Sequence, residues 1–295
     1  MTMYSQGEEQ AIREDVFRWL DDKVGSGAYE LTRQGLVAYC YGDLPMPLLD
    51  RARGIRNPAD FASTLSIMTG VNNTYTDAVS GDGFVHYSYQ SREGGDNLKL
   101  RRALELGAPM VYFQGVRKSI YVAHYPVFAV ADDQDNRTFL IALEESMRFF
   151  GDPLHMTGDE RRYAERAVRQ RLHQPIFRAR VMHAYASTCA VCRLKHAELL
   201  DAAHIVEDAE LGGLAVVTNG LALCKIHHAA YDRNLMGITP DYEVRIDAAL
   251  LDEIDGPMLR YGLQDMHGQT LELPERFRDR PSKDGLALRW QKFAA

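Results

Sequence analysis

Two short pairs of metal-ligating residues constrain the fold of this chain more than any other feature of its sequence. Cys189-x-x-Cys192 is followed by Cys224-x-x-His227, and the gap between the pairs is long enough for the chain to fold back. Three thiolates and one imidazole are ligands that tetrahedral zinc prefers. We therefore predict one structural zinc ion per chain, against the alternative of buried cysteines that lie close together by coincidence.

The fourth cysteine and two nearby histidines are not expected to join this site. Cys40 lies in the apolar run GLVAYCY, where a strand with a buried, small hydrophobic residue is the simpler interpretation. His183 and His196 are close in sequence but lack the paired spacing. Because three of the four cysteines follow a metal-binding pattern, a disulfide framework is not expected, which suits a reducing compartment.

The composition is that of an ordinary globular protein with two domains. The chain has 295 residues, of which 46% are hydrophobic and 25% are charged, and this length exceeds one average domain. No apolar run is long enough to span a bilayer. The N-terminal residues MTMYSQGEEQAIRED lack the basic start and the apolar centre of a secretion signal. We expect a cytoplasmic protein that does not associate with membranes.

The sequence pattern indicates an α+β fold for the first half of the chain. Apolar residues at helical spacing predict a helix over residues 8–24. Short runs rich in Val, Tyr and Phe, separated by Gly, Asp, Asn and Pro, then predict strands through residues 31–143. One helix near residues 96–106 interrupts them. This half is predicted to form a mainly β domain with a curved or closed sheet.

A break at Gly151-Asp152-Pro153 separates this half from the rest of the chain. Thr157 and Glu160 then form a capping-box pattern that opens a helix, and Pro175 fits the first turn of another. The predicted divisions are a first domain over residues 1–150, a helical basic linker over 151–172 and a second domain over 173–295.

Positive charge is concentrated in one part of an acidic protein. The net charge of −7 counts mildly against a nucleic-acid-binding protein. Between residues 161 and 195, however, Glu165 is the one acidic residue, and such a local stripe can bind phosphates. The alternative is a solvated helix face. The basic residues of the stripe are Arg161, Arg162, Arg166, Arg169, Arg171, Arg178, Arg180, Arg193 and Lys195.

Three residues beside the zinc ligands suit phosphodiester hydrolysis. His204 ends a strand-like run, and Asn219 begins a turn signal before LALCKIHHAAYD, which we expect to be helical. His228 follows His227 on that helix, and neighbouring positions point about 100° apart, so the two histidines can face different sites. A neutral imidazole can deprotonate water, and an asparagine can orient the ring of that base. A divalent ion can neutralise the phosphate.

This segment resembles the HNH, or ββα-metal, endonuclease family in the fragments AAHI, NGLALC and HHAAYD, and in FRARVMHAY before CAVC. The resemblance implies that His204 is the general base, Asn219 the central asparagine and His228 a ligand of the catalytic ion. Many HNH enzymes carry a second metal ligand directly before the base, where this chain has Ala203. Asp201 is the nearest acid, and we expect it to assist at the metal or to orient a neighbour. The residues implied to hold the structural zinc are Cys189, Cys192, Cys224 and His227.

The first half contains a candidate pocket for a base extruded from DNA. Tyr75 and Tyr87 can stack on the two faces of such a base, and the carboxylate of Asp77 can accept a hydrogen bond from the exocyclic amine of cytosine. Asp82 is the alternative acid. Tyrosines at this spacing in a strand are also explained by packing in the core or across strands.

The order Y-x-D, DGxVxYS, DNxxLxxA, PxVYF and YxAxYPV resembles SRA domains over roughly residues 30–145. SRA domains are PUA-like β-barrels that flip 5-methylcytosine or 5-hydroxymethylcytosine out of the duplex. By this resemblance Tyr75 and Tyr87 stack on the flipped base, and Asp77 binds its Watson–Crick edge. The spacing from the tyrosine to the acid is one residue shorter here than in the eukaryotic pattern.

An SRA domain followed by an HNH domain is the layout of modification-dependent, type IV-like restriction endonucleases. The two resemblances therefore imply cleavage of double-stranded DNA that carries a modified cytosine, with structural Zn²⁺ and catalytic Mg²⁺ or Mn²⁺, or else Co²⁺ or Ni²⁺. Since each HNH centre cuts one strand, we expect a homodimer. Two alternatives stay open: an HNH endonuclease without dependence on modified bases, and a non-catalytic zinc-containing DNA-binding protein.

Overall fold

The structure is a computed structural model that describes residues 3–25, 29–50, 53–71, 83–90, 95–150, 152–168, 174–207 and 216–294. The chain divides into two compact units, Met1–Pro175 and Ile176–Ala295. Within the described ranges, no helix combines the length and the apolar character that crossing a bilayer requires.

The first unit is built from one large sheet with flanking helices. Its strands are β1 (Leu31–Thr32), β2 (Cys40–Tyr41), β3 (Leu44–Pro45), β4 (Ile55–Arg56), β5 (Ser66–Thr69), β6 (Val85–Ser88), β7 (Met110–Arg117), β8 (Ile120–Asp133) and β9 (Thr138–Ala142). Its helices are α1 (Gln6–Gly25), α2 (Arg33–Val37), α4 (Asp96–Leu106), η1 (Glu145–Phe149) and α5 (Gly158–Val168).

The large sheet is curled. Its described strands follow the order β4-β5-β7-β8-β9-β6, and β1 pairs with β8. The β5–β7 pair is parallel and the other pairs are antiparallel. β8 pairs with β7 through its first half and with β9 through its second, and register shifts interrupt both ladders; such irregularities bend a sheet. Since the path from β4 to β6 does not close among these strands, a closed SRA-like barrel stays a prediction.

The alternation of side chains along β7 separates two parts of the core. Met110 and Tyr112 face a cluster that includes residues of α4, whereas Val111 and Phe113 face a cluster that includes residues of α1. All four side chains are buried because helices cover both faces of this strand. The helix predicted over residues 8–24 is confirmed as α1, and the helix predicted near residues 96–106 is confirmed as α4.

The prediction for Cys40 is wrong. The run GLVAYCY is divided between the end of α2 and the two-residue strand β2, so it is not one continuous strand. In the short β2–β3 hairpin the side chain of Cys40 is exposed. Because a helix ends in the middle of this run, its apolar residues do not follow a single period. This explains why the strand prediction for the run is wrong.

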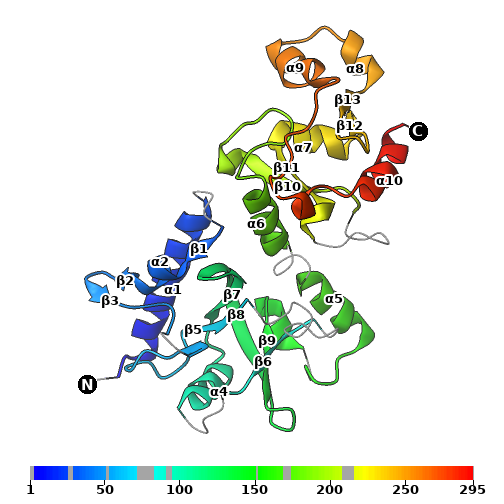
Figure 1. Ribbon diagram of the computed structural model, residues 1–295. Helices are drawn as coiled ribbons and strands as arrows, with labels where there is room; N and C mark the ends of the chain where they lie inside the picture. Colours follow the sequence, from blue (N-terminus) through cyan, green and yellow to red (C-terminus); the bar gives the residue numbers. More distant parts are fainter. Residues whose placement is uncertain are drawn as a thin grey trace. The chain divides into compact units, whose positions relative to one another are not determined.

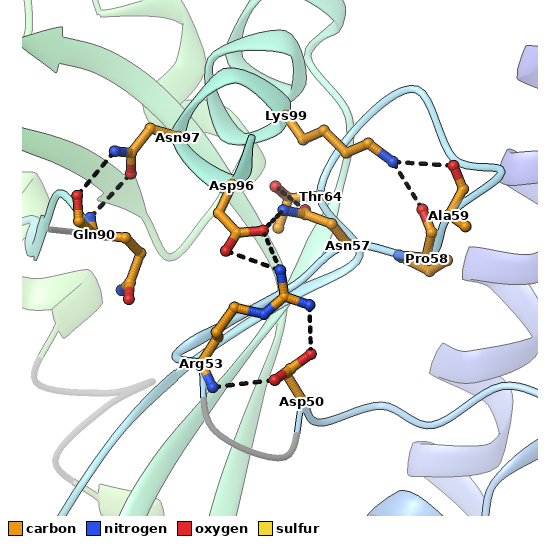
Figure 2. Close-up of polar contacts among 10 residues, drawn as sticks. All are labelled: Asp50, Arg53, Asn57, Pro58, Ala59, Thr64, Gln90, Asp96, Asn97 and Lys99. Carbon is orange, nitrogen blue, oxygen red and sulfur yellow. Dashed lines mark hydrogen bonds and ion pairs between the residues drawn. The ribbon is translucent and has the colours of Figure 1, made fainter. Parts of the chain in front are cut away.

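Polar contacts fix the beginning of α4, where the DNxxLxxA run starts (Figure 2). Asp96 accepts hydrogen bonds from Arg53 at 3.1 and 3.2 Å and from Asn57 at 2.8 Å. The carboxamide of Asn97 exchanges two hydrogen bonds with the backbone of Gln90, at 3.0 and 3.1 Å. The first two residues of the run therefore tie α4 to neighbouring segments of the first unit.

The second unit places two small antiparallel sheets among short helices (Figure 1). Its strands are β10 (Leu200–His204), β11 (Gly220–Cys224), β12 (Met236–Ile238) and β13 (Val244–Ile246). Its helices are α6 (Gln174–Ala184), η3 (Ala197–Leu199), η4 (Val217–Asn219), α7 (Lys225–Asp232), α8 (Ala248–Asp252), α9 (Pro257–Gly262), η5 (Gln264–Met266), η6 (Phe277–Asp279) and α10 (Lys283–Phe293).

One element of this unit differs from its prediction. The run LALCKIHHAAYD is not one helix, because residues 221–224 belong to β11 and the helix begins at Lys225. Every residue of β11 is buried. A short strand buried on both faces has no alternation, so its sequence cannot be told apart from a buried turn of helix.

Candidate active site and metal centre

The candidate site is built on a β-hairpin and the helix that follows it. β10 and β11 are antiparallel, with Leu200 opposite Cys224 and His204 opposite Gly220. α7 begins directly after Cys224 and contacts both strands. This ββα unit brings together the end of β10, the turn before β11 and the first two turns of α7, which carry the predicted histidines and asparagine.

The predicted zinc ligands converge at one end of this unit. The ligand atoms of Cys189, Cys192, Cys224 and His227 all lie within 4.8 Å of one another. The Sγ atoms of Cys192 and Cys224 are 3.9 Å apart, and the Nδ1 atom of His227 lies 3.6 Å from the Sγ atom of Cys189. Zn–S bonds of about 2.3 Å imply tetrahedral edges of about 3.8 Å. The donor set and its spacing therefore fit zinc.

The ring of His227 is oriented for this role by a backbone contact. Its Nε2 atom lies 2.8 Å from the carbonyl oxygen of Gly262. A carbonyl can only accept, so Nε2 carries a proton and donates it, which leaves Nδ1 to bind the metal. Burial disfavours a charge on His227, but the contacts with Cys189 and Cys224 outweigh it and raise its pKa to about 9.

His204 lies at the end of β10, against an aromatic ring that orients it. The rings of His204 and Phe177 are stacked, with centroids 3.9 Å apart and planes 14° apart. Gly220 leaves room for this stack, because a Cβ atom there would lie 2.9 Å from the Cζ atom of Phe177. α6 thus supplies a flat surface that restricts the tilt of the imidazole. This contact could not be predicted from the sequence, because nothing local shows what packs against α6.

Replacing Phe177 by leucine is expected to lower the rate constant for DNA cleavage about tenfold, because a base displaced by a fraction of an ångström loses much of its effect. Gly220→Ala, which would push the same ring away, should give a similar defect. Single-turnover cleavage at saturating enzyme would measure both, with zinc content and circular dichroism as controls for folding. A rate within twofold of the unmodified protein in both variants would exclude a positioning role for Phe177.

Asn219 fixes the backbone that follows the candidate base. It is 6% exposed, and its carboxamide accepts from the amide of Val206 and donates to the carbonyl of Val206, both at 2.9 Å. Its own carbonyl accepts from the amide of Ile205 at 2.9 Å. These three hydrogen bonds hold the chain as it leaves β10, so Asn219 determines where His204 is presented.

His228 lies between two carboxylates. Its Nδ1 atom is 3.7 Å from Asp201 on β10, and its Nε2 atom is 3.4 Å from Asp232, one turn further along α7. Asp201 also forms ion pairs with Lys225 and, at 3.6 Å, with Arg178. Imidazole and carboxylate donors suit a divalent ion. Residues 201 and 203 point to the same face of the strand, so Asp201 lies on the face where Ala203 offers no ligand.

Arg178 has a structural role that the charge pattern did not predict. Its guanidinium donates to the carbonyl oxygens of Ala197 at 3.1 Å and Leu200 at 2.5 Å, in addition to its ion pair with Asp201. It therefore anchors the start of β10 to α6. Arg178 belongs to the second unit and Arg161 lies on α5 of the first, so the predicted basic stripe is divided between the units.

The candidate base pocket of the first unit is only partly described. Tyr75, Asp77 and Asp82 lie outside the described residues. Tyr87, on β6, is 4% exposed, and its hydroxyl donates to the carbonyl of Met68 at 3.3 Å. Burial raises its pKa. The ring therefore lies in the core cluster, and the stacking role of Tyr87 stays a prediction.

Comparison with known proteins identifies the second unit. The family model of HNH endonucleases matches residues 189–239. The modification-dependent restriction endonuclease TagI is a similar solved structure, with 17% identity and a TM-score of 0.33 over 88% of this chain and 90% of TagI. The type IV phosphorothioation-dependent restriction endonuclease ScoMcrA is 15% identical, with a TM-score of 0.24 over 61% of this chain and 51% of ScoMcrA. No curated protein matches the chain.

Residues 189–239 contain the ββα unit, the four candidate zinc ligands and the three candidate catalytic residues. They form an HNH endonuclease domain, and the protein is a nuclease that acts on DNA. Nucleases of this kind depend on a metal ion, and the Cys₃His group has the ligands to hold a zinc ion as well.

Proposed function

We propose that the chain is a modification-dependent restriction endonuclease, in which the second unit cleaves DNA and the first unit reads a modified cytosine. The nuclease part is supported by one observation above all: β10, β11 and α7 bring His204, Asn219 and His228 onto a single ββα unit beside the Cys₃His group. A zinc-binding module without catalysis has no need of these three residues.

In the proposed cleavage centre each residue has a separate task. His204 accepts a proton from the attacking water, and Phe177 and Asn219 hold it in place. Position 203, where many HNH enzymes carry a second metal ligand, is an alanine here. His228 and Asp201 would therefore hold a divalent ion such as Mg²⁺ or Mn²⁺. Such an ion stabilises the negative charge of the phosphate and of the leaving oxygen. Zn²⁺ at the Cys₃His group would stabilise the fold.

The proposed reader acts by base flipping. Tyr75 would stack on an extruded 5-methylcytosine or 5-hydroxymethylcytosine, and Asp77 would accept a hydrogen bond from its exocyclic amine. Tyr87 would form the inner wall of the pocket, because its ring is buried close to β5. The order of motifs along residues 30–145 supports this part of the proposal, together with the curled sheet that carries them.

The proposal is tested by digesting matched plasmids, one bearing 5-methylcytosine and one unmodified, with Mg²⁺ or Mn²⁺. We expect cleavage of the methylated plasmid at least about tenfold faster, since one additional methyl group in a fitted apolar pocket contributes about 1–3 kcal/mol. Asp77→Ala should abolish this preference while cleavage capacity remains. Equal cleavage of both plasmids would agree with the nuclease function of the second unit and would exclude recognition of a modified base by the first unit.

A second candidate is an HNH endonuclease that does not depend on modified bases. The burial of Tyr87 favours it, because a ring that is 4% exposed offers little surface to an incoming base. Under this candidate Asp77→Ala leaves the relative cleavage of the two plasmids unchanged, so the same digest separates the two functions.

We also propose that two chains act together on duplex DNA. One HNH centre cuts one strand, and a symmetric pair of chains can cut both. Light scattering of the protein with and without DNA measures the number of chains directly.

A further inference from the structure

One segment of the second unit presents an aromatic ring to solvent beside the active site. Residues 274–283 lie between η5 and α10 in the sequence, and their middle forms the single turn η6. Phe277, at the start of η6, is 84% exposed, and the side chain of Arg278 is 78% exposed. Arg276 is exposed as well. We call residues 276–278 the tip.

The tip is held firmly, although its side chains are exposed. The amides of Asp279 and Arg280 donate to the carbonyls of Arg276 and Phe277, at 3.0 and 3.2 Å, which closes the turn. The hydroxyl of Tyr242 donates to the carbonyl of Pro281 at 3.0 Å. Further along, Leu286 of α10 is fully buried in the core of the unit. The residues that follow the turn are therefore attached to the core of the second unit.

The same segment is bonded to the turn that carries Asn219. The amide of Ser282 donates to the carbonyl of Thr218 at 2.8 Å, and η6 contacts η4, of which Asn219 is the last residue. Ile205, which directly follows the candidate base, lies close to Gly285 in the first turn of α10. The position of the tip relative to the catalytic turn is thus determined by direct contacts within one unit.

Basic residues lie beside Phe277 in the sequence. Arg276 and Arg278 are its direct neighbours, and the guanidinium of Arg280 lies 5.6 Å from the centre of its ring. Arg276 also lines a cavity of about 560 Å³ that Arg193 and Lys195 line as well. Acidic residues share this surface: Glu272, Glu275 and Asp279 line the same cavity, and Asp279 pairs with Arg278 at 3.9 Å. Arg278 is nevertheless far more exposed than its acidic partner, with 78% of its side chain exposed against 26% for Asp279.

A single exposed apolar side chain is common and indicates nothing by itself. Here an exposed aromatic ring, three arginines and a rigid attachment to the catalytic turn coincide. Arginines bind the phosphates of a duplex, and an apolar side chain in the minor groove can insert between base steps and unstack them. An acidic partner surface would match the arginines but would not require an aromatic ring aimed outward between them.

We propose that the tip is a DNA-contacting wedge, in which Phe277 inserts between base pairs near the scissile phosphate while Arg276 and Arg278 bind the flanking phosphates. This inference rests on the endonuclease function of the second unit. It names duplex DNA as the partner of a surface outside the ββα unit, and it gives that surface the task of bending or opening the duplex at the cleavage position.

The test uses the full chain with Ca²⁺ in place of the catalytic ion, and labelled duplexes with and without 5-methylcytosine. We expect Phe277→Ala to weaken binding of the preferred duplex about tenfold, as loss of an aromatic stack does. Arg276→Ala combined with Arg278→Ala should reduce the slope of log K against log salt by about 2. Ile254→Ala, which removes a 98% exposed apolar residue elsewhere in the unit, is the matched control and should bind normally.

A second measurement tests the insertion of Phe277 between base pairs directly. The fluorescence of 2-aminopurine placed along the duplex should rise at one step on binding of the unmodified protein, and Phe277→Ala should lose this rise while Phe277→Tyr keeps it. Unchanged binding and fluorescence in Phe277→Ala, from a protein that cleaves DNA, would overturn the wedge alone. A changed molecular mass with unchanged DNA affinity would overturn it in favour of a contact between chains. Absence of cleavage by the unmodified protein would instead count against the nuclease.

Discussion

Replacing His204 by alanine is expected to lower the rate of DNA cleavage by about 10²–10⁴-fold, the contribution that a positioned general base makes. His204 stands at the end of β10, its ring stacked on Phe177 at 3.9 Å, and the backbone after it is fixed by Asn219. Removal of the imidazole leaves this frame intact. Affinity for duplex DNA and zinc content should therefore stay unchanged while the chemical step slows.

Single-turnover cleavage of a plasmid with Mg²⁺ or Mn²⁺ measures this effect. His196→Ala is the matched control, because His196 is exposed and precedes η3 at a distance from the hairpin turn in the sequence. We expect it to cleave like the unmodified protein. If His204→Ala retained more than about a tenth of the activity, another group would have to act as the base, and the assignment of His204 would be wrong.

The chemistry of the site could be predicted from the sequence because metal ligands and catalytic groups are restricted to a few residue types at fixed spacing. The pairs Cys189–Cys192 and Cys224–His227 do converge, and they do so at the end of a hairpin. His227 and His228 face different partners, as their adjacent positions on a helix require. Such spacing is local in the sequence, so it can be recognised without knowledge of the fold.

Residues that act through tertiary contacts could not be predicted in this way. The contacts of Phe177 and Arg178 with β10 are of this kind, because nothing local shows that α6 lies against β10. The burial of Tyr87 likewise depends on how β6 and β5 pack in the core, which its spacing from Tyr75 and the order of motifs do not show. The strand β11 was taken for helix because a run buried on both faces has no period.

The same distinction explains why Asp201 was identified while its partners were not. Acids can be counted along the sequence, and Asp201 is the nearest to Ala203, the position where many HNH enzymes carry a metal ligand. Its ion pairs with Lys225 and Arg178 join three elements, so they arise only once β10 lies between α6 and α7. The carboxylate that we propose as a metal ligand is therefore also the point where these elements are held together.

The zinc site carries the other large expected effect. Cys224→Ser should reduce the zinc content from one equivalent to less than about a tenth, and it should lower the melting temperature of the second unit by more than about 10 °C, since structural zinc contributes folding free energy directly. Cys224 is 5% exposed and its Sγ atom lies 3.1 Å from the Nδ1 atom of His227 and 3.9 Å from the Sγ atom of Cys192. A hydroxyl at this position cannot replace a thiolate ligand.

Metal analysis of the purified protein and thermal melting followed by circular dichroism measure this effect. Cys40→Ser is the matched control, because Cys40 is an exposed free thiol of the first unit, and it should retain zinc and melt unchanged. Since β11 and α7 join at Cys224, loss of the metal should also displace His228 from Asp201 and abolish cleavage. An unmodified protein with less than about half an equivalent of zinc, purified without chelators, would show that the Cys₃His group holds no structural zinc.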